Sequence, residues 1–123
     1  MNQARLIDLI DHMQQASNDA CSFVEGLGKE DFFEDKRTQN AVLMSILVLG
    51  EAATKLMDRY PDFVKKHPEI SWNSMKGMRN RLAHGYFDIN LDVVWDTVTI
   101  AVPDLRTKLP QLQEAAIKEF SEL

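Results

Sequence analysis

Apolar side chains recur at alternating steps of three and four residues along most of the chain, a pattern typical of amphipathic α-helices. In the first segment the apolar stripe runs from Leu6 to Leu27, and Gly26 and Gly28 are expected to end the helix. The stripe consists of Leu6, Ile10, Met13, Ser17, Ala20, Val24 and Leu27, widened by Leu9, Ala16 and Phe23.

A polar turn follows, in which Phe32 and Phe33 are expected to tuck under the bundle. The next helix, predicted from about Asp35 to Arg59, is apolar on nearly all sides and should be the most buried element. Pro61 stops it. Its small residues, Gly50, Ala52 and Ala53, predict the close approach of a neighbouring helix.

A third helix is predicted between Ser71, its N-cap, and Gly85, which follows its last turn. Its inward stripe reads Trp72, Met75, Arg79 and Leu82. Arginine is almost never fully buried without a partner. Arg79 is therefore expected either at the lip of a cleft or bound to a carboxylate, for which Glu51 in the second helix is the obvious candidate.

Asn90 caps a fourth predicted helix, in which Pro103 predicts a kink or break. Its inner face is formed by Leu91, Val94, Trp95, Val98, Val102 and Leu105. Pro110 opens or continues a terminal helix, with Leu112, Ala116 and Phe120 pointing inward. The whole pattern predicts one domain over residues 1–123, an all-α up-and-down bundle of four or five helices.

Composition supports one compact domain, because 45% of the 123 residues are hydrophobic and 27% are charged. The single Cys21 excludes a disulfide within the chain and fits a reducing cytoplasm. The uncharged run 38–50 is shorter than the roughly 18 apolar residues that a membrane span needs. Asp8, Asp11 and His12 interrupt any apolar stretch of a secretory signal. We therefore expect a cytoplasmic protein without a membrane role.

The net charge of −5 argues against a nucleic-acid partner when it is taken as a sum. Its distribution changes that picture, because residues 59–86 hold six basic and two acidic residues, a local +4. The rest of the chain holds eight basic and seventeen acidic residues, or −9. The chain could hold a polyanion at this segment, although solvated helix faces explain the same charges.

Familiar catalytic motifs are absent from the sequence: it has no Gly-rich phosphate loop, no Cys/His metal spacing and no serine nucleophile elbow. Asp8 and His12 lie four residues apart, a spacing more typical of a surface ion pair than of a metal site. His67, between a lysine and a proline, is expected in a loop. No metal or cofactor is expected.

The remaining cluster is RNRLAHGY, from Arg79 to Tyr86. Metal-free RNA transesterification needs a base for the 2′-hydroxyl, an acid for the leaving 5′-oxygen and positive charge on the phosphorane. Imidazole and guanidinium are suited to these tasks. Arg79 and His84 are about 140° apart on an ideal helix, so they converge only if the helix ends near His84, which Gly85 permits. A purely structural interpretation pairs Arg79 with Glu51 and makes His84 a helix cap.

Three stretches resemble the HepT branch of the HEPN superfamily, small helical proteins with an Arg-x4-6-His motif: GEAATKL (50–56), PEISW (68–72) and GMRNRLAHGYFDINLDVVW (77–95). The resemblance covers roughly residues 35–109. It implies a cytoplasmic ribonuclease toxin of a type VII-like HEPN/MNT toxin–antitoxin pair, acting on tRNA or mRNA as a homodimer whose motifs face each other across a cleft. The implied antitoxin is a minimal nucleotidyltransferase that adenylylates the motif tyrosine.

Carried onto this sequence, the resemblance makes Arg79 and His84 the catalytic pair, Asn80 the polar residue after the arginine and Tyr86 the tyrosine that receives AMP. Glu51 is expected to support the site by orienting Arg79. The expected reaction is metal-independent and leaves a 2′,3′-cyclic phosphate. Two alternatives remain: a noncatalytic dimer that binds a nucleotide or the partner nucleotidyltransferase, and a purely structural scaffold.

Overall fold

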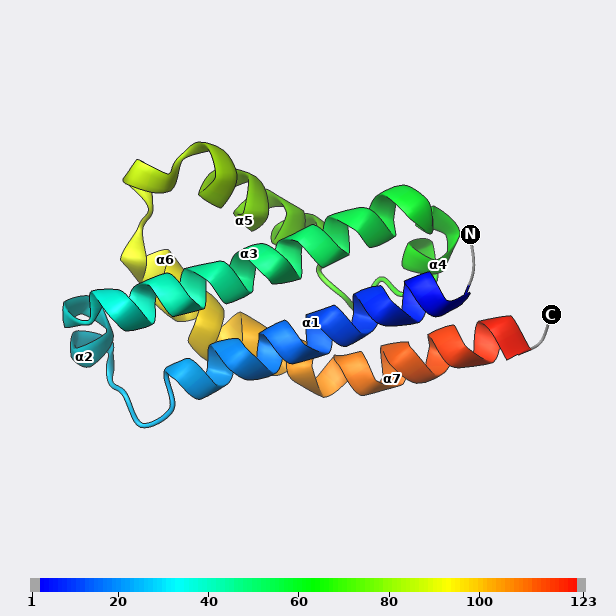
Figure 1. The fold of residues 1–123 in the computed structure, drawn as a ribbon, viewed down its shortest axis with the longest axis horizontal. Helices are drawn as coiled ribbons and strands as arrows, with labels where there is room; N and C mark the ends of the chain where they lie inside the picture. Colours follow the sequence, from blue (N-terminus) through cyan, green and yellow to red (C-terminus); the bar gives the residue numbers. More distant parts are fainter. Residues whose placement is uncertain (1–2, 122–123) are drawn as a thin grey trace.

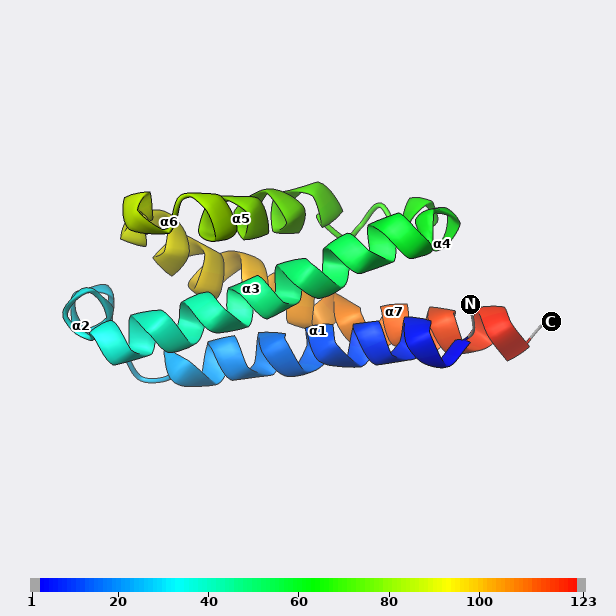
Figure 2. The ribbon, with the colours of Figure 1, turned by 45° about the horizontal axis from the view of Figure 1, so that its top comes forward.

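The computed structural model describes residues 3–121, apart from the side chains of residues 3, 4, 86, 120 and 121. Within that range the chain forms helices and turns and no strand, which confirms the all-α prediction. The four main helices are α1 (Gln3–Phe23), α3 (Lys36–Arg59), α5 (Trp72–His84) and α7 (Val102–Ser121). They lie side by side in the order α5, α3, α1, α7, each antiparallel to its neighbour (Figure 1, Figure 2).

Shorter elements connect them: α2 (Lys29–Glu34), α4 (Pro61–Lys65), the 3-10 turn η1 (Tyr86–Asp88), α6 (Leu91–Asp96) and the π-helical turn η2 (Thr97–Ala101). The first turn of α1 and the last turn of α7 lie at one end of the bundle, and α2 lies at the other end (Figure 1). The helix that carries most of the motif, α5, packs along one side of α3.

The first helix is shorter than its apolar stripe predicts. α1 ends at Phe23, and Gly26 adopts φ +79°, a left-handed conformation that favours glycine and turns the chain away. Val24 and Leu27 consequently lie in the turn, where they are half-buried, and Phe23 is exposed. The prediction of a helical stripe that continues to Leu27 was wrong. The spacing of apolar residues carries no information about the residue at which the backbone leaves the helix.

The expected polar turn is in fact helix α2, and only one of its two phenylalanines is buried. Phe32 is fully buried and packs against Trp95, with ring centroids 5.3 Å apart. Phe33 lies at the surface, since adjacent helix positions are about 100° apart and cannot both face inward. The Asp31 carboxylate fixes the start of this helix by accepting a hydrogen bond from the Gly28 N–H at 3.0 Å.

The bounds of α3 match the prediction. Asp35 is its N-cap, and its carboxylate accepts hydrogen bonds from the Thr38 N–H (3.0 Å) and hydroxyl (2.6 Å). These bonds favour the charged form and lower the pKa of Asp35. The helix ends at Arg59, and Pro61 begins α4 at a position where its missing N–H is harmless.

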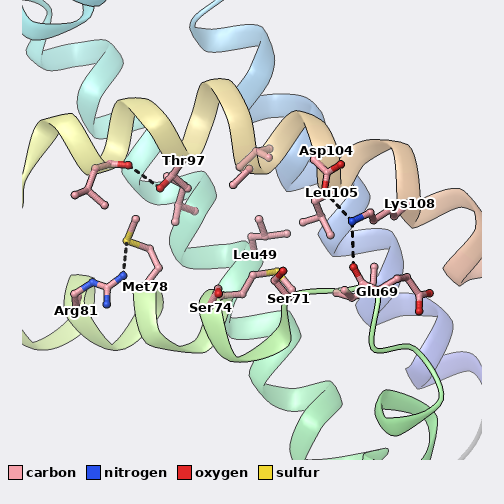
Figure 3. A pocket seen from close by; sticks show the side chains of 16 residues that line it. Leu49, Glu69, Ser71, Ser74, Met78, Arg81, Thr97, Asp104, Leu105 and Lys108 are labelled. Carbon is pink, nitrogen blue, oxygen red and sulfur yellow. Dashed lines mark hydrogen bonds and ion pairs between the residues drawn. The ribbon is translucent and has the colours of Figure 1, made fainter.

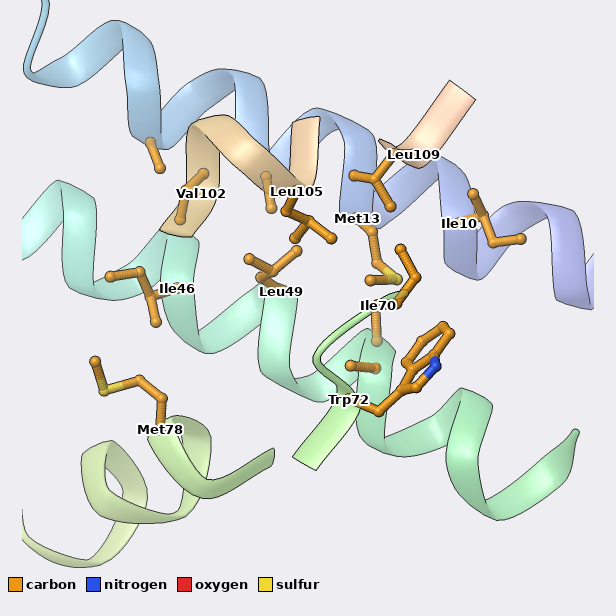
Figure 4. Close-up of a cluster of buried hydrophobic side chains, with 14 of the residues drawn as sticks. Ile10, Met13, Ile46, Leu49, Ile70, Trp72, Met78, Val102, Leu105 and Leu109 are labelled. Carbon is orange, nitrogen blue, oxygen red and sulfur yellow. The ribbon is translucent and has the colours of Figure 1, made fainter. Parts of the chain in front are cut away.

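The hydrophobic core lies around α3 (Figure 4). Leu49 and Leu56 of α3 are buried, as are Met13 of α1 and Leu105 of α7. Each such side chain stabilises the fold by about 1.5–3 kcal/mol. By length and composition alone, α3 could span a membrane. However, 56% of its most apolar 18-residue stretch is buried inside the protein, as is usual for a helix in a hydrophobic core.

The predicted fourth helix consists of α6, η2 and the start of α7, which follow one another without a break but differ in hydrogen-bond pattern. After α6 the chain passes through η2, where the Val102 N–H donates to the Thr97 carbonyl five residues back. Pro103 follows in the first turn of α7. The expected irregularity is thus a π-helical turn placed just before the proline. Pro110 lies inside α7, so it continues the terminal helix; the Phe120 side chain is outside the described residues.

Two glycines sit inside helices in opposite surroundings. A Cβ atom added to Gly50 on α3 would lie 2.5 Å from the Cβ of Arg79 and 2.9 Å from the Met75 carbonyl oxygen on α5. A Cβ added to Gly77 on α5 would meet only the Arg81 Nη1 atom, at 3.8 Å. The predicted close approach of a neighbouring helix is therefore confirmed at Gly50, and the neighbouring helix is α5.

We expect Gly50→Ala to destabilise the protein by about 1–3 kcal/mol, because the methyl group forces α3 and α5 apart. Gly77→Ala is the matched control and should stabilise it by about 0.5–1 kcal/mol, because alanine costs less backbone entropy in a helix. Urea unfolding of both variants measures the difference. A Gly50→Ala variant as stable as the parent would contradict the close contact.

Candidate functional site

The centre of the candidate site is an ion pair between α3 and α5. The Arg79 Nε–H donates to the Glu51 Oε1 atom at 2.5 Å, which confirms the predicted partner. Arg79 Nη1 donates to the Asn80 Oδ1 atom at 2.7 Å. The Arg79 Nη2 atom forms no hydrogen bond with the described residues. The guanidinium is thus held on two sides and keeps one nitrogen for a ligand.

This ion pair is only partly shielded from water, since 26% of the Arg79 side chain and 45% of the Glu51 side chain are exposed. Pairs in such surroundings contribute at most about 1 kcal/mol to stability. Orientation is the greater effect, because two fixed acceptors restrict a long side chain that would otherwise sample many rotamers. The arrangement presents a permanent positive charge at the surface in a defined direction.

His84 is the last residue of α5, and it is exposed. Gly85 ends the helix as predicted, with its N–H bonded to the Arg81 carbonyl at 2.8 Å, but with φ −133° and not in a left-handed conformation. The helix is regular through His84, so Arg79 and His84 remain about 140° apart around its axis. In the described part of the chain no hydrogen bond joins them.

The structure therefore brings together Arg79, Glu51 and Asn80, and it leaves His84 on another side of the same helix. The backbone of Tyr86 opens η1 directly after the helix end. Its side chain is outside the described residues, so the modification of its hydroxyl group stays a prediction. His67, expected in a loop, lies there within 3.2 Å of the Glu69 carboxylate.

An apolar surface lies beside Glu51 on α3. Val48 and Met44 precede Glu51 by one and two helical turns, and their residues are 40% and 60% exposed. They border a groove of about 320 Å³ between α1 and α3, into which His12 also faces. Large hydrophobic side chains gathered on one exposed face are typical of a surface that binds another protein.

Metal ligands are scarce near this site. Within residues 3–121, no three His, Cys, Asp or Glu side chains with a described position lie close enough to hold a metal ion together. Arg81 within the motif and Phe87 directly after it had no individual role in the sequence prediction. A signal for Arg81 was its spacing of three residues from His84, which places the two on one helix face.

Comparison with known proteins assigns the family. The family model described as "Ribonuclease HepT-like" matches residues 13–112. The chain is 36% identical over 102 residues to a candidate RNase of Methanocaldococcus jannaschii, covering 83% of this chain and 78% of that protein. It is 35% identical over 107 residues to a probable ribonuclease HepT of Thermococcus cleftensis, covering 87% and 94%. No solved structure matches. The chain belongs to the HepT-like ribonuclease family.

Proposed function

We propose that this protein is a metal-independent endoribonuclease in which Arg79 and His84 carry out the cleavage. The observation that carries the proposal is the Arg79 guanidinium, fixed by Glu51 and Asn80 with its Nη2 atom left for a ligand, in a chain of a ribonuclease family. A guanidinium fixed in this way offers the N–H bonds of Nη2 and its permanent positive charge to phosphate oxygens.

In the proposed reaction the 2′-oxygen attacks the adjacent phosphorus, and the bond from phosphorus to the 5′-oxygen breaks. A base removes the 2′-hydroxyl proton, and an acid protonates the departing 5′-oxygen. Arg79 stabilises the negative charge that develops on the phosphorane. The product is a 2′,3′-cyclic phosphate. His84 supplies one of the two proton transfers, since imidazole exchanges protons near neutral pH.

The second proton transfer is assigned to a second copy of the chain. One imidazole does not readily act as base and acid in a single turnover, and within one copy His84 lies on a different side of α5 from Arg79. A two-fold homodimer provides two histidines and two arginines around one cleft. The exposed apolar face at Met44 and Val48, next to Glu51, is the proposed contact between the copies.

The biological role proposed is that of a cytoplasmic toxin whose substrate is tRNA or mRNA. Its proposed partner is a minimal nucleotidyltransferase antitoxin that transfers AMP to Tyr86. Membership of the HepT-like ribonuclease family and the position of Tyr86 two residues beyond His84 support this proposal. A noncatalytic dimer that binds a nucleotide or this partner is the second candidate, supported by the same partly exposed guanidinium.

Arg79→Ala and His84→Ala are each expected to lower RNA cleavage by about 100-fold or more while leaving the helical circular dichroism unchanged. Arg79→Lys should also fail, since a point charge does not replace a fork. Glu51→Gln should retain part of the activity, because an amide still accepts the Nε hydrogen bond. Cleavage by the parent should persist in EDTA and yield cyclic phosphate ends.

Arg106→Ala, a change to an exposed arginine on α7, is the control for the loss of a positive charge. Cleavage that disappears in EDTA would contradict the metal-independent mechanism. A parent protein that binds nucleotides and leaves RNA intact would favour the noncatalytic candidate.

Val48→Glu is expected to convert the dimer into a monomer and to abolish cleavage, because it places a charge in the proposed apolar contact. Ile100→Glu is the matched control, since Ile100 is 67% exposed and lies in η2, away from that groove. Light scattering at micromolar concentration gives the oligomeric state. A monomeric parent that still cuts RNA would refute the shared site.

Co-expression with the cognate nucleotidyltransferase should add one or more AMP masses to the peptide that contains Tyr86 and should abolish cleavage. The added phosphate would occupy the surroundings of Arg79 and repel RNA. Tyr86→Phe should escape modification and remain toxic in the presence of the antitoxin. If Tyr86→Phe is neutralised as well as the parent, the antitoxin acts by binding and not by modification.

A further inference from the structure

α5 has a second cationic side that the Arg79 site does not use. Arg81 lies two positions after Arg79, about 200° further around the helix, so its side chain leaves α5 on the side away from Glu51. There it stands at the edge of a groove of about 210 Å³ between α5 and the α6–α7 segment (Figure 3). Leu49, Met78 and Leu105 provide apolar surface in this groove.

A second hollow, of about 250 Å³, adjoins the first at Arg81, Met78 and Val93. It extends under the end of α5 and the η1 turn, where Gly85 and Asp88 line it. Arg81 thus stands where the two hollows meet, close to the end of α5 that carries His84.

Arg81 has no carboxylate partner among the described residues. Its one hydrogen bond there is a weak contact from Nη2 to the Met78 sulfur at 3.9 Å. Asp88 lines the second hollow without forming an ion pair with it. Lys108, at the far end of the groove, is by contrast bound to Asp104 at 2.8 Å and to the Glu69 carbonyl at 3.1 Å (Figure 3). The groove therefore offers one guanidinium that an anion can bind.

Phe87 lies in η1, three residues after His84, and is 99% exposed. Such exposure is unusual for a large aromatic residue, which normally gains free energy by burial. The next exposed large hydrophobic residue along the described chain is Val93, which is 43% exposed and lines the groove rather than η1. Protein interfaces bury clusters of apolar side chains. An aromatic ring exposed to this extent, three residues after His84 in the chain, is suited to stacking on a nucleobase.

We propose that Arg81 and Phe87 form a subsite for the RNA nucleotide next to the bond that is cut, which rests on the ribonuclease function proposed above. Arg81 binds the phosphate of this nucleotide, and Phe87 stacks on its base. His84 lies between them in the sequence. It is an i,i+3 neighbour of Arg81 on α5, about 5–6 Å away between Cβ atoms, and η1 begins two residues after it. Stacking accepts any base, so the subsite supplies affinity rather than a sequence code.

The test measures binding of a 12-nucleotide 2′-O-methyl RNA, which cannot be cleaved because its 2′-oxygens are blocked, at several salt concentrations. Arg81→Ala should reduce the slope of log Kd against log salt by about 0.7, the value for one lost phosphate contact with a single strand. Phe87→Ala should weaken binding about tenfold with an unchanged slope, and Phe87→Trp should restore it. Arg106→Ala and Ile100→Ala are matched controls that should bind like the parent.

Cleavage of unmodified RNA separates this proposal from the function on which it depends. We expect Arg81→Ala and Phe87→Ala to raise KM with a much smaller change in kcat. A parent that cuts RNA while both variants bind and cut like it would overturn the subsite alone. A Phe87→Ala variant that becomes monomeric would also overturn it, because the ring would then belong to an interface between copies. A parent that neither cuts nor binds RNA would overturn the ribonuclease function itself.

Discussion

The close contact between α3 and α5 at Gly50 determines the geometry of the candidate site. Because Gly50 has no side chain, the Cβ of Arg79 lies against the α3 backbone. The next residue on α3, Glu51, then meets the Nε atom of Arg79 directly. A larger residue at position 50 would move α5 outward and leave the ion pair without its short contact. One absent side chain in the helix interior therefore sets the direction of the guanidinium.

Helical periodicity distributes the motif over several sides of one short helix. Arg79 faces α3, Arg81 faces the groove toward α6 and α7, and His84 lies between these two directions at the helix end. A single copy thus presents its groups to different regions of space. Concentrating two of them on one phosphate requires either a bent substrate or a second chain, and an isologous dimer satisfies this need with residues already present.

Elements governed by local rules could be predicted from the sequence. The bounds of α3 follow from the Asp35 cap and Pro61, and the Arg79–Glu51 pair follows from an arginine on an apolar stripe facing a carboxylate among small residues. Features that depend on backbone detail could not: the end of α1 depends on the left-handed conformation of Gly26, and η2 depends on a hydrogen bond that reaches five residues back. In the proposed mechanism Arg79 and His84 meet across two copies of the chain, and a single sequence does not position one copy relative to the other.

The local charge of +4 overstates the positive surface available to RNA, because part of it is neutralised by partners elsewhere in the chain. Arg79 is paired with Glu51, and Lys66 contacts Glu119 at 2.9 Å. A protein with a net charge of −5 also gains little from long-range attraction of a polyanion. Binding must then depend on a few short-range contacts whose geometry the fold fixes in advance. The orientation of single cations therefore matters more than their number. The α3–α5 contact at Gly50 provides this orientation for Arg79.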